Sequence, residues 1–286
     1  MMSNTVKIII AFICFSNSIN AQEFKETITK ELSFKNKSSE NLIIVDNVYG
    51  SIEVEGYNGN TIKIEVDKKI KGLNTRSLEQ GKKEIGIKIV EKGNYIYVYL
   101  DSPYTVFDIE TGRFSHNERN SRRNYNYLLN FKIKVPMKTN IELKAINNGN
   151  IYVKNINTTQ IVVKNINGAI TLDNVSGQTY VNALNKDINI TYNENPKNES
   201  SYYSLNGDIK IIVKEKLNAD ISFKSLNGNF YTNFETSKLD SEISLKETKS
   251  RKGIKYKLNS KERFKIGNGG VKLNFDVLNG DVIIKR

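Results

Sequence analysis

The stretch Ile141–Gly228 repeats one phrase, an Ile or Leu followed by Asn, a tight corner and a short alternating strand. The copies read INNGNIYV at Ile146–Val153, INGAITL at Ile166–Leu172, LNKDINI at Leu184–Ile190, LNGDIKI at Leu205–Ile211 and LNGNFYT at Leu226–Thr232, and LNGDVII follows at Leu278–Ile284. In the first five copies, the residue before the first Asn lies at 146, 166, 184, 205 and 226. A nearly fixed step of this size indicates a structural repeat.

The strand after each corner alternates apolar and polar residues. Ile209 and Ile211, for example, alternate with Asp208 and Lys210. A register slip of one residue would expose every apolar side chain, so the register is strongly specified. One unit buries too few side chains, at roughly 1.5–3 kcal/mol each, to offset a backbone ordering cost of about 1–2 kcal/mol per residue. Stacked units would share one core.

The repeat therefore favours an all-β fold, a single-stranded parallel β-solenoid (β-helix-like) with coils of about 20 residues. The Ile or Leu before each Asn would then form a ladder with one residue per coil, and the Gly would supply the positive φ of the corner. Asn-Gly between alternating strands is also a strong hairpin signal. An antiparallel β-sandwich therefore stays open as the alternative.

The first 21 residues are typical of a signal peptide, with Lys7 before the short apolar run Ile8–Phe15 and a small, polar stretch up to Ala21. The run is too short to span a bilayer. Cleavage after Ala21 would remove Cys14, the single cysteine, and would leave no transmembrane segment. We therefore expect an exported protein, located in the periplasm, on the outer surface or in the medium.

The mature chain is expected to consist of a lead-in or cap at residues 22–41 and a β-strand-repeat domain at residues 42–286. Two segments interrupt the domain, a long polar insertion at residues 101–130 and an irregular excursion at residues 237–263. Leu73–Lys83 is compatible with a short helix or a loop. A long insertion in a compact array is either functional or disordered.

The segment VPMKTNIELKAINNGNIYVKNI, the early NVYGSIEVEG and the C-terminal FKIGNGGVKLNFDVLNGDVII resemble the bacterial putative-adhesin family of exported β-strand-repeat envelope proteins. The resemblance covers most of residues 42–286, apart from the two interruptions. It implies a β-solenoid exported to the cell envelope. It offers no catalytic residues to transfer to this chain.

The residue inventory offers little for catalysis, and no catalytic, cofactor-binding or metal-binding residue is predicted. His116 is the one histidine, so sites built on several imidazoles are excluded, and its polar surroundings predict a solvated side chain. Asp187, Asp208 and Asp281 follow the corner at equivalent positions. Asn150 and Asn229 take the same position, which favours hydrogen bonding to backbone N–H groups over carboxylate chemistry.

The insertion contains a basic, aromatic set that could bind ligand. These residues are Arg113, Arg119, Arg122, Arg123, Tyr125 and Tyr127. Guanidinium groups bind phosphate and carboxylate, and tyrosine rings stack on other groups. The chain has 43 Lys and Arg against 31 Asp and Glu, which favours anionic partners. Anionic glycan, lipopolysaccharide or another envelope protein is therefore expected, and nucleic acid is not.

The favoured function is a non-catalytic envelope protein, an adhesin or a surface scaffold. One alternative is a carbohydrate-active β-helix enzyme acting on an acidic polysaccharide, which a groove combining carboxylates with Arg or Lys would favour. Another is an accessory or sensor protein of an envelope-stress system. The sequence indicates no oligomeric state.

Overall fold

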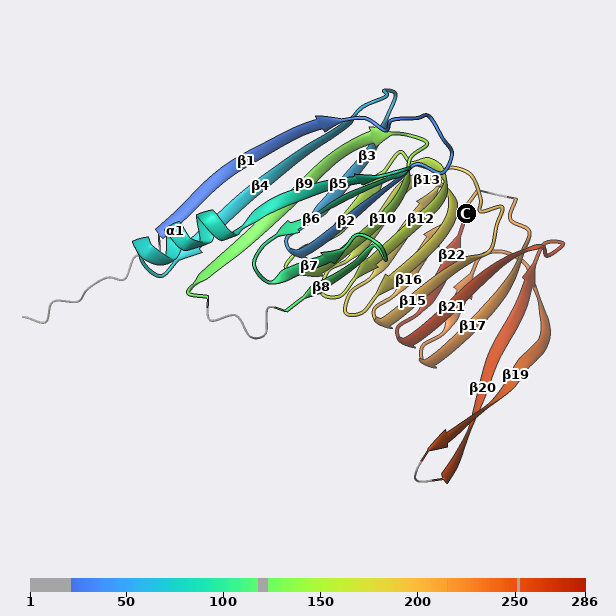
Figure 1. The fold of residues 1–286 in the computed structure, drawn as a ribbon. Coiled ribbons are helices and arrows are strands. Elements are labelled where there is room, and N and C mark those ends of the chain that lie inside the picture. Colours follow the sequence, from blue (N-terminus) through green and yellow to red (C-terminus); the bar gives the residue numbers. More distant parts are fainter. Residues whose placement is uncertain (1–21, 118–122, 215, 251–252) are drawn as a thin grey trace, which may run out of the picture.

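The computed structural model describes residues 22–117, 123–214, 216–250 and 253–286. The predicted all-β class is confirmed for the described part of the chain, with 66% strand and 4% helix. The strands form a strongly curled sheet of mixed parallel and antiparallel pairs, and a two-stranded hairpin lies on it (Figure 1). Residues 1–21, for which a signal peptide is predicted, lie outside the described residues.

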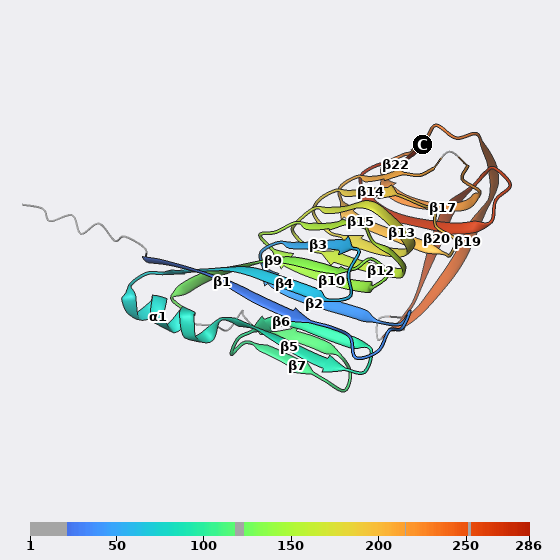
Figure 2. The ribbon, with the colours of Figure 1, turned by 90° about the horizontal axis from the view of Figure 1, so that it is seen from above.

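Two sets of strands, ladder A and ladder B, make up the curled sheet (Figure 2). In spatial order, ladder B contains β5 (Gly86–Lys92), β6 (Tyr95–Asp101), β2 (Leu42–Tyr49), β10 (Asn140–Asn147), β12 (Asn157–Asn165), the second half of β13 (Ile170–Ala183), β15 (Ser200–Asn206), β21 (Val271–Asn279), β17 (Ala219–Asn227), β20 (Gly253–Ile266) and β19 (Thr236–Ser250). From β6 to β17 every neighbouring pair is parallel.

Ladder A takes the strands that follow the corners. Its order is β1 (Gln22–Leu32), β4 (Ile62–Gly72), β9 (Tyr125–Pro136), β3 (Ile52–Tyr57), β11 (Ile151–Lys154), the first half of β13, β14 (Ile188–Tyr192), β16 (Ile209–Ile212), β22 (Val282–Lys285) and β18 (Phe230–Thr232). The strands before and after an Asn-Gly corner therefore lie in different ladders, so these corners are not hairpin turns.

The core lies between the two ladders, as the alternating pattern requires. Fully buried side chains from ladder B, such as Ile161 and Val163, meet those from ladder A, such as Ile170 and Leu172. Tyr192 and Tyr202 are buried among them, and their hydroxyl groups lie 2.6 Å apart. The alternate side chains along each strand, which point away from the core, form the outer faces of the array.

The spatial order of the repeats departs from their order along the chain. The C-terminal strands β21 and β22 lie between β15–β16 and β17–β18, so the copy at Leu278 is stacked between those at Leu205 and Leu226. The C-terminal copy suits an interior place, because Leu273, Phe275 and Val277 are buried and the Phe275 ring stacks on Tyr202 at 4.8 Å. A regular step along the chain does not reveal such an insertion.

The Ile and Leu residues before the Asn stack one per repeat as predicted, but they face outward. Smaller residues such as Ala145 and Ala183 occupy the preceding, inward position. The ladder residues Ile146, Ile166, Leu184 and Leu205 are partly exposed, Leu278 is 37% exposed and Leu226 is 71% exposed. Apart from Ile146, which packs against the core, the stack therefore belongs to the surface of the array.

Glycine serves the corners in two ways. Gly207 and Gly280 have φ values of +150° and +145°, as predicted for the corner. Gly168 does not have a positive φ, but a Cβ atom there would lie 1.9 Å from the carbonyl oxygen of Gly149 in the neighbouring repeat. The corners are packed so closely that a side chain at Gly168 would collide with the backbone of the next unit.

Three segments have more regular structure than the sequence predicted. The undecided stretch forms helix α1 (Thr75–Glu84), where the Asn74 side chain accepts a hydrogen bond from the Ser77 N–H at 2.9 Å and caps the helix. The polar insertion contains the hairpin of β7 (Thr105–Asp108) and β8 (Arg113–His116), and its last residues begin β9. The excursion is the long antiparallel hairpin β19–β20, which projects from the array (Figure 1).

Candidate ligand-binding faces

A ladder of asparagine side chains runs along the corners. Each amide group after the first donates to the amide oxygen of the preceding residue, over 2.7–3.3 Å, in the order Asn147, Asn167, Asn185, Asn206, Asn279 and Asn227. The ladder follows the spatial order of the units and so includes the inserted C-terminal copy. An amide side chain both donates and accepts, which allows it to repeat along a stack without charge.

The acidic residues after the corners bind backbone, as predicted. The side chain of Asp187 accepts from the backbone N–H of Asp208 at 3.0 Å, Asp208 accepts from Asp281 at 3.1 Å, and Asp281 accepts from Asn229 at 2.9 Å. Each acceptor thus serves the neighbouring repeat in space. This bonding accounts for a position that an acid or an amide can fill equally well.

The predicted basic set is only partly visible. Arg113 is exposed on β8, whereas Arg119 and Arg122 lie outside the described residues. Arg123 lies over the rings of Tyr49, Tyr125 and Tyr127, at 5.3, 6.0 and 4.9 Å from their centroids. Arg113 and Arg123 thus belong to different environments.

Both tyrosines of the predicted set are buried in β9. The Tyr125 hydroxyl donates to Glu84 Oε2 at 2.5 Å, and burial with this contact raises the pKa of Tyr125. Tyr127 packs edge-on against Tyr49, with 5.1 Å between the ring centroids. These rings hold β9 against its surroundings and do not offer exposed faces for stacking.

The prediction that the His116 side chain is solvated is wrong. Its side chain is 8% exposed, and its Nε2 atom forms a hydrogen bond with Oδ1 of Asp46 on β2. Asp46 is itself buried and forms an ion pair with Lys144 at 3.1 Å, while Thr105 Oγ1 lies 3.3 Å from His116 Nδ1. The sequence could not show this, because residue 46 approaches residue 116 through the fold of the hairpin.

The β7–β8 hairpin is further held by an aromatic cluster. Phe107 and Phe114 stack on each other at 4.8 Å and pack on Tyr97 and Tyr99 of β6. Burial raises the pKa of both tyrosines. The hairpin therefore covers the outer face of ladder B at one end.

A shallow groove of about 320 Å³, here called the tyrosine groove, lies farther along the outer face of ladder B. Its main polar and aromatic lining comes from Lys164, Tyr180, Asn182, Tyr203, Asn274 and Asp276. Lys261 of β20 lines it where the long hairpin departs. The lining residues come from five strands of the array and one strand of the hairpin.

The parallel register sets the spacing of the two tyrosines. Tyr180 pairs with Ser201 and Asn182 pairs with Tyr203, so the tyrosines are diagonal neighbours on adjacent strands. A strand spacing of about 4.8 Å and a rise of about 3.3 Å per residue place their Cβ atoms roughly 8 Å apart. The two rings can therefore contact one extended ligand.

Some polar groups of the groove already bond to residues outside its lining. The Tyr180 hydroxyl accepts from Gln178 at 2.6 Å, Asn274 donates to Glu199 at 2.7 Å, and Asp276 forms an ion pair with Lys224 at 3.4 Å. The Asn182 side-chain oxygen is buried and has no hydrogen-bond partner among the described residues. A buried acceptor left in this way is costly unless a ligand or water donates to it.

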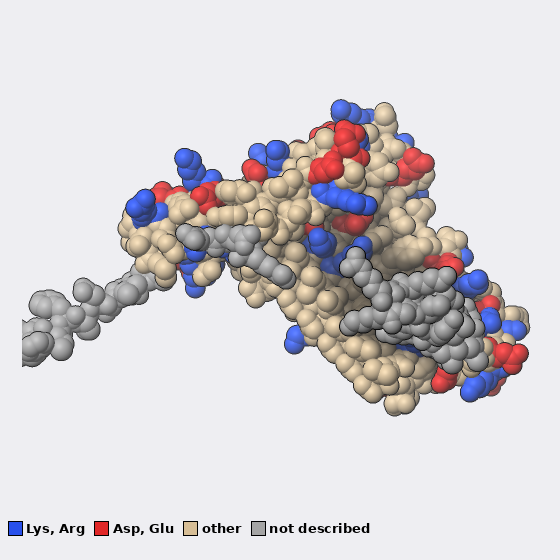
Figure 3. All heavy atoms as spheres, turned by 60° about the horizontal axis from the view of Figure 1, so that its bottom comes forward, with Lys and Arg blue, Asp and Glu red and all other residues tan. Residues whose placement is uncertain are grey.

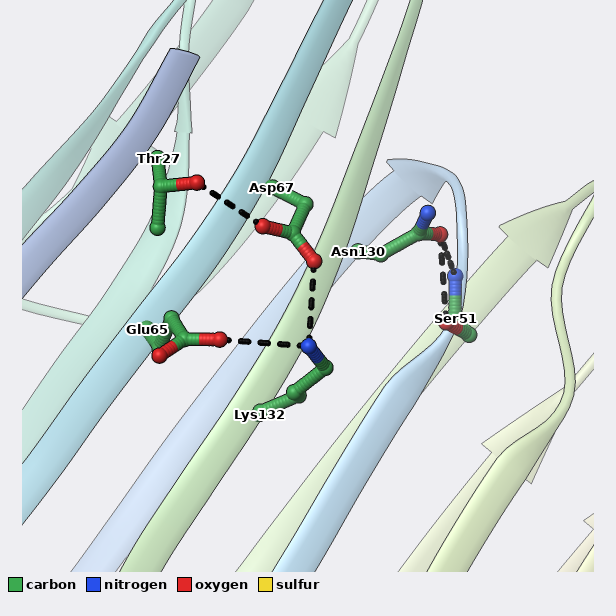
Figure 4. Close-up of polar contacts among 6 residues, drawn as sticks. All are labelled: Thr27, Ser51, Glu65, Asp67, Asn130 and Lys132. Carbon is green, nitrogen blue, oxygen red and sulfur yellow. Dashed lines mark hydrogen bonds and ion pairs between the residues drawn. The ribbon is translucent and has the colours of Figure 1, made fainter.

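A second groove, about 610 Å³ and here called the charged groove, lies on the outer face of ladder A over β1, β4, β9 and β3. Lys132 lies 3.1 Å from Glu65 and 3.1 Å from Asp67, which also accepts from Thr27 (Figure 4). Farther across the face, Glu55 lies 3.6 Å from Lys134. Lysines and carboxylates thus largely neutralise each other along this groove.

Sequence reasoning missed both grooves. Tyr180 and Tyr203 stand in different positions relative to their corners, and only the register makes them neighbours. Strict alternation does mark their side chains as outward, since Thr179, Val181 and Tyr202 are buried. An aromatic residue at an outward strand position was therefore the available signal.

Two negative findings apply to the part of the chain that is described. No helix there is long and apolar enough to cross a membrane. No group of three or more His, Cys, Asp or Glu residues is placed there to hold a metal ion.

Neither a family model nor a curated protein matches the chain. Among solved structures, it is similar to a putative cell adhesion protein from Clostridium sporogenes, with 13% identity, 92% of this chain and 99% of that chain covered, and a TM-score of 0.44. It is also similar to a putative adhesin from Bacteroides fragilis, with 10% identity, coverage of 91% and 96%, and a TM-score of 0.30.

A putative lipid binding protein from Parabacteroides distasonis is 12% identical, with coverage of 91% and 96% and a TM-score of 0.27. The names of the first two structures agree with the adhesin family that the sequence resembles. All three likenesses are distant, and they carry no argument about ligand or activity.

Proposed function

We propose that this protein is a non-catalytic β-repeat protein of the bacterial cell envelope that binds glycan along the outer face of ladder B. The parallel ladders with their closely packed corners support the interpretation of the scaffold as a β-solenoid. The observation that carries the function is the tyrosine groove. It combines outward tyrosine rings with amide, hydroxyl and charged groups on a rigid sheet.

The chemistry of the groove suits a sugar chain. The apolar body of a tyrosine ring packs on the C–H face of a sugar, and amide groups both donate to and accept from hydroxyl groups. Asn182 and Asn274 supply amide groups to the lining of the groove. A shallow, open groove on the outer face of a sheet also admits a long polymer, which a deep pocket would exclude.

The charge of the groove favours an acidic glycan. Lys164 and Lys261 line it, while the carboxylate of Asp276 lies 3.4 Å from Lys224. A polymer with carboxylate or sulfate groups would therefore meet these two lysines, and the excess of Lys and Arg in the chain adds a general attraction. Such binding should weaken as salt is raised.

The test is affinity electrophoresis and calorimetry with polygalacturonate and with a neutral glucan. Tyr180→Ala combined with Tyr203→Ala should weaken polygalacturonate binding at least about tenfold, since aromatic anchors dominate such contacts. Tyr231→Ala is the matched control, because Tyr231 is 49% exposed on ladder A. Equal affinity of the groove variant and the control, with melting temperatures unchanged, would refute the groove as the site.

The predicted basic set provides a separate arm of the test. Charge reversal of Arg113, Arg119, Arg122 and Arg123 should abolish retention on lipopolysaccharide beads if this segment contributes to surface binding. Arg123 packs on three rings, so a variant that leaves Arg123 intact controls for damage to the fold. Unchanged retention of both variants would remove the segment from the proposal.

The charged groove supports a second candidate, a carbohydrate-active enzyme. Lys132 on β9 pairs with Glu65 on the neighbouring strand β4 and with Glu53 on the other neighbour, β3. The backbones of the two glutamates are therefore two strand spacings apart, roughly 10 Å. Inverting glycosidases hold two carboxyl groups about 6.5–9.5 Å apart, one to protonate the leaving oxygen and one to activate water. The lysine neighbours count against it, because an ion pair stabilises the ionised carboxylate and a general acid must hold a proton.

The two candidates are separated by a reducing-end assay on acidic polysaccharides. Release of new chain ends by the protein, and its loss in Glu53→Gln and Glu65→Gln, would establish an enzyme. Binding without chain cleavage over prolonged incubation would support the non-catalytic function.

A further inference from the structure

An aliphatic ridge on the outside of the array is, apart from Ile146, which packs against the core, not part of the hydrophobic core cluster. It consists of the residues that precede the asparagine ladder, in the spatial order Ile146, Ile166, Leu184, Leu205, Leu278 and Leu226. Each is at least partly exposed, yet all six are Ile or Leu. An outward position at a strand end is ordinarily free to be polar.

The inward position beside the ridge shows that the core does not demand these residues. Ala145, Ala183 and Ser204 are fully buried there, next to Ile146, Leu184 and Leu205 on the ridge. The larger apolar side chain thus faces the surface and the smaller one faces the core. A strip of Ile and Leu with this orientation is typical of an interaction surface.

The ridge and the asparagine ladder form one uncharged strip. None of its twelve residues is Lys, Arg, Asp or Glu, although 26% of the chain is charged. The corners lie along the lower margin of the array in Figure 1, and Figure 3, with this side turned forward, shows a broad area without charged side chains. Charged groups border that area.

We propose that the ridge is the contact by which two copies of this chain pair in solution. Two molecules with a formal charge of +12 repel each other, and a neutral strip allows them to approach. Another copy is also the partner whose side chains match the ridge in spacing, since both repeat at the strand spacing of about 4.8 Å. Amide groups of the two asparagine ladders can bond across such a contact, because each donates and accepts.

The dimensions of the ridge fit a weak or moderate dimer. Six rungs at about 4.8 Å extend over roughly 24 Å. Stable interfaces bury about 800 Å² per partner, which a single file of six side chains does not supply. The contact therefore includes the asparagine ladder beside it, and dimerisation should depend on concentration.

A two-fold arrangement also closes on itself. The same surface is used on both copies, so pairing stops at two molecules and forms no filament. Growth from the edge at the other end of the array is disfavoured, because edge strand β1 carries Glu23, Lys25, Glu26, Lys30 and Glu31.

The decisive experiment measures the mass of the purified protein by light scattering and analytical ultracentrifugation across a concentration series. Leu226→Lys combined with Leu278→Lys should weaken dimerisation about 100-fold, because two charges then face the partner in a desolvated contact. Both side chains are exposed, so the change should leave the melting temperature nearly unaltered. Ile212→Lys is the control, since Ile212 is 49% exposed on ladder A, and it should dimerise normally.

Site-directed crosslinking gives an independent readout. Cys14 is the one native cysteine, so Leu205→Cys in a Cys14→Ser background places a single thiol near the middle of the ridge. Mild oxidation should yield a disulfide-linked dimer from this variant and none from Ile212→Cys in the same background.

Any one of three results would overturn the proposal: a protein that stays monomeric at all concentrations, a double lysine variant that dimerises as well as the wild type, or two cysteine variants that crosslink equally. A monomer that binds phosphatidylglycerol vesicles, and loses that binding in the double lysine variant, would show instead that the ridge meets lipid.

Discussion

Replacing Gly168 by alanine tests how closely the repeats are packed at their corners. A Cβ atom at this position would lie 1.9 Å from the carbonyl oxygen of Gly149 and 2.6 Å from the side-chain nitrogen of Asn165. Neither contact can be relieved by rotating a flexible side-chain end, since one atom is backbone and Asn165 is buried. The neighbouring repeats must therefore move apart by about 1.5 Å to reach van der Waals distance.

The cost follows from the hydrogen bonds that cross this corner. The Asn167 N–H donates to the Ile146 carbonyl at 3.1 Å, the Ile151 N–H donates to the Ala169 carbonyl at 2.9 Å, and the Asn165 amide donates to the Gly149 carbonyl at 3.0 Å. Weakening two or three such bonds, at about 1 kcal/mol each, and straining the packing should lower the free energy of unfolding by about 2–4 kcal/mol. The melting temperature should fall by roughly 5–15 °C.

The matched control is Gly93→Ala. Gly93 has a φ of +60° in the turn between β5 and β6, and a Cβ atom there would meet nothing within 4 Å. This variant has only the strain of the left-handed backbone, about 1 kcal/mol. Thermal and urea unfolding followed by circular dichroism would compare the two, and the reasoning fails if Gly168→Ala is no less stable than Gly93→Ala.

Two further predictions concern buried polar groups. Asp46→Asn should lower the free energy of unfolding by about 2–3 kcal/mol, because it breaks the buried contact with His116 and the ion pair with half-exposed Lys144. Limited proteolysis should then cut faster within the β7–β8 hairpin, and an unchanged cleavage pattern would contradict this. Burial raises the pKa of Tyr192 and of Tyr202, so their contribution to stability is complete below the unfolded value of about 10 and is lost as the pH rises above it. Replacing both by Phe should flatten the loss of stability between about pH 9 and 12, and parallel curves for variant and wild type would refute the assignment.

The sequence predicts the architecture well where one residue determines one local property. Alternation of apolar residues sets the strands and their inward faces, and the recurring corner after the Ile-Asn or Leu-Asn pair marks the turns from ladder B into ladder A. The same reasoning fails at the Ile or Leu before the Asn. Its apolar character suggests burial, but small residues such as Ala145 hold the inward position. The hydrophobicity of this residue therefore does not indicate whether its side chain points inward or outward.

Features that depend on contacts between distant segments were beyond the sequence. A step of 21 residues links Leu205 to Leu226 along the chain, but the β19–β20 hairpin allows the C-terminal strands to return and fill the place between them. The burial of His116 depends on Asp46, 70 residues earlier. The predicted basic set was chosen by composition, which does not distinguish exposed Arg113 from Tyr125, buried in β9.

The outward positions of the two ladders differ in a way that bears on function. On ladder A, lysine and carboxylate side chains alternate across β4, β9 and β3 and form ion pairs with each other, so this face is already satisfied without a ligand. At the tyrosine groove of ladder B, tyrosine, asparagine and serine side chains lie beside Lys164, Lys261 and Asp276, which pairs with Lys224. Because both ladders share the same core, this difference is not required by folding. The difference between the two outer faces is therefore best explained by a ligand that binds ladder B. Binding experiments should for this reason begin with the tyrosine groove and not with the larger charged groove.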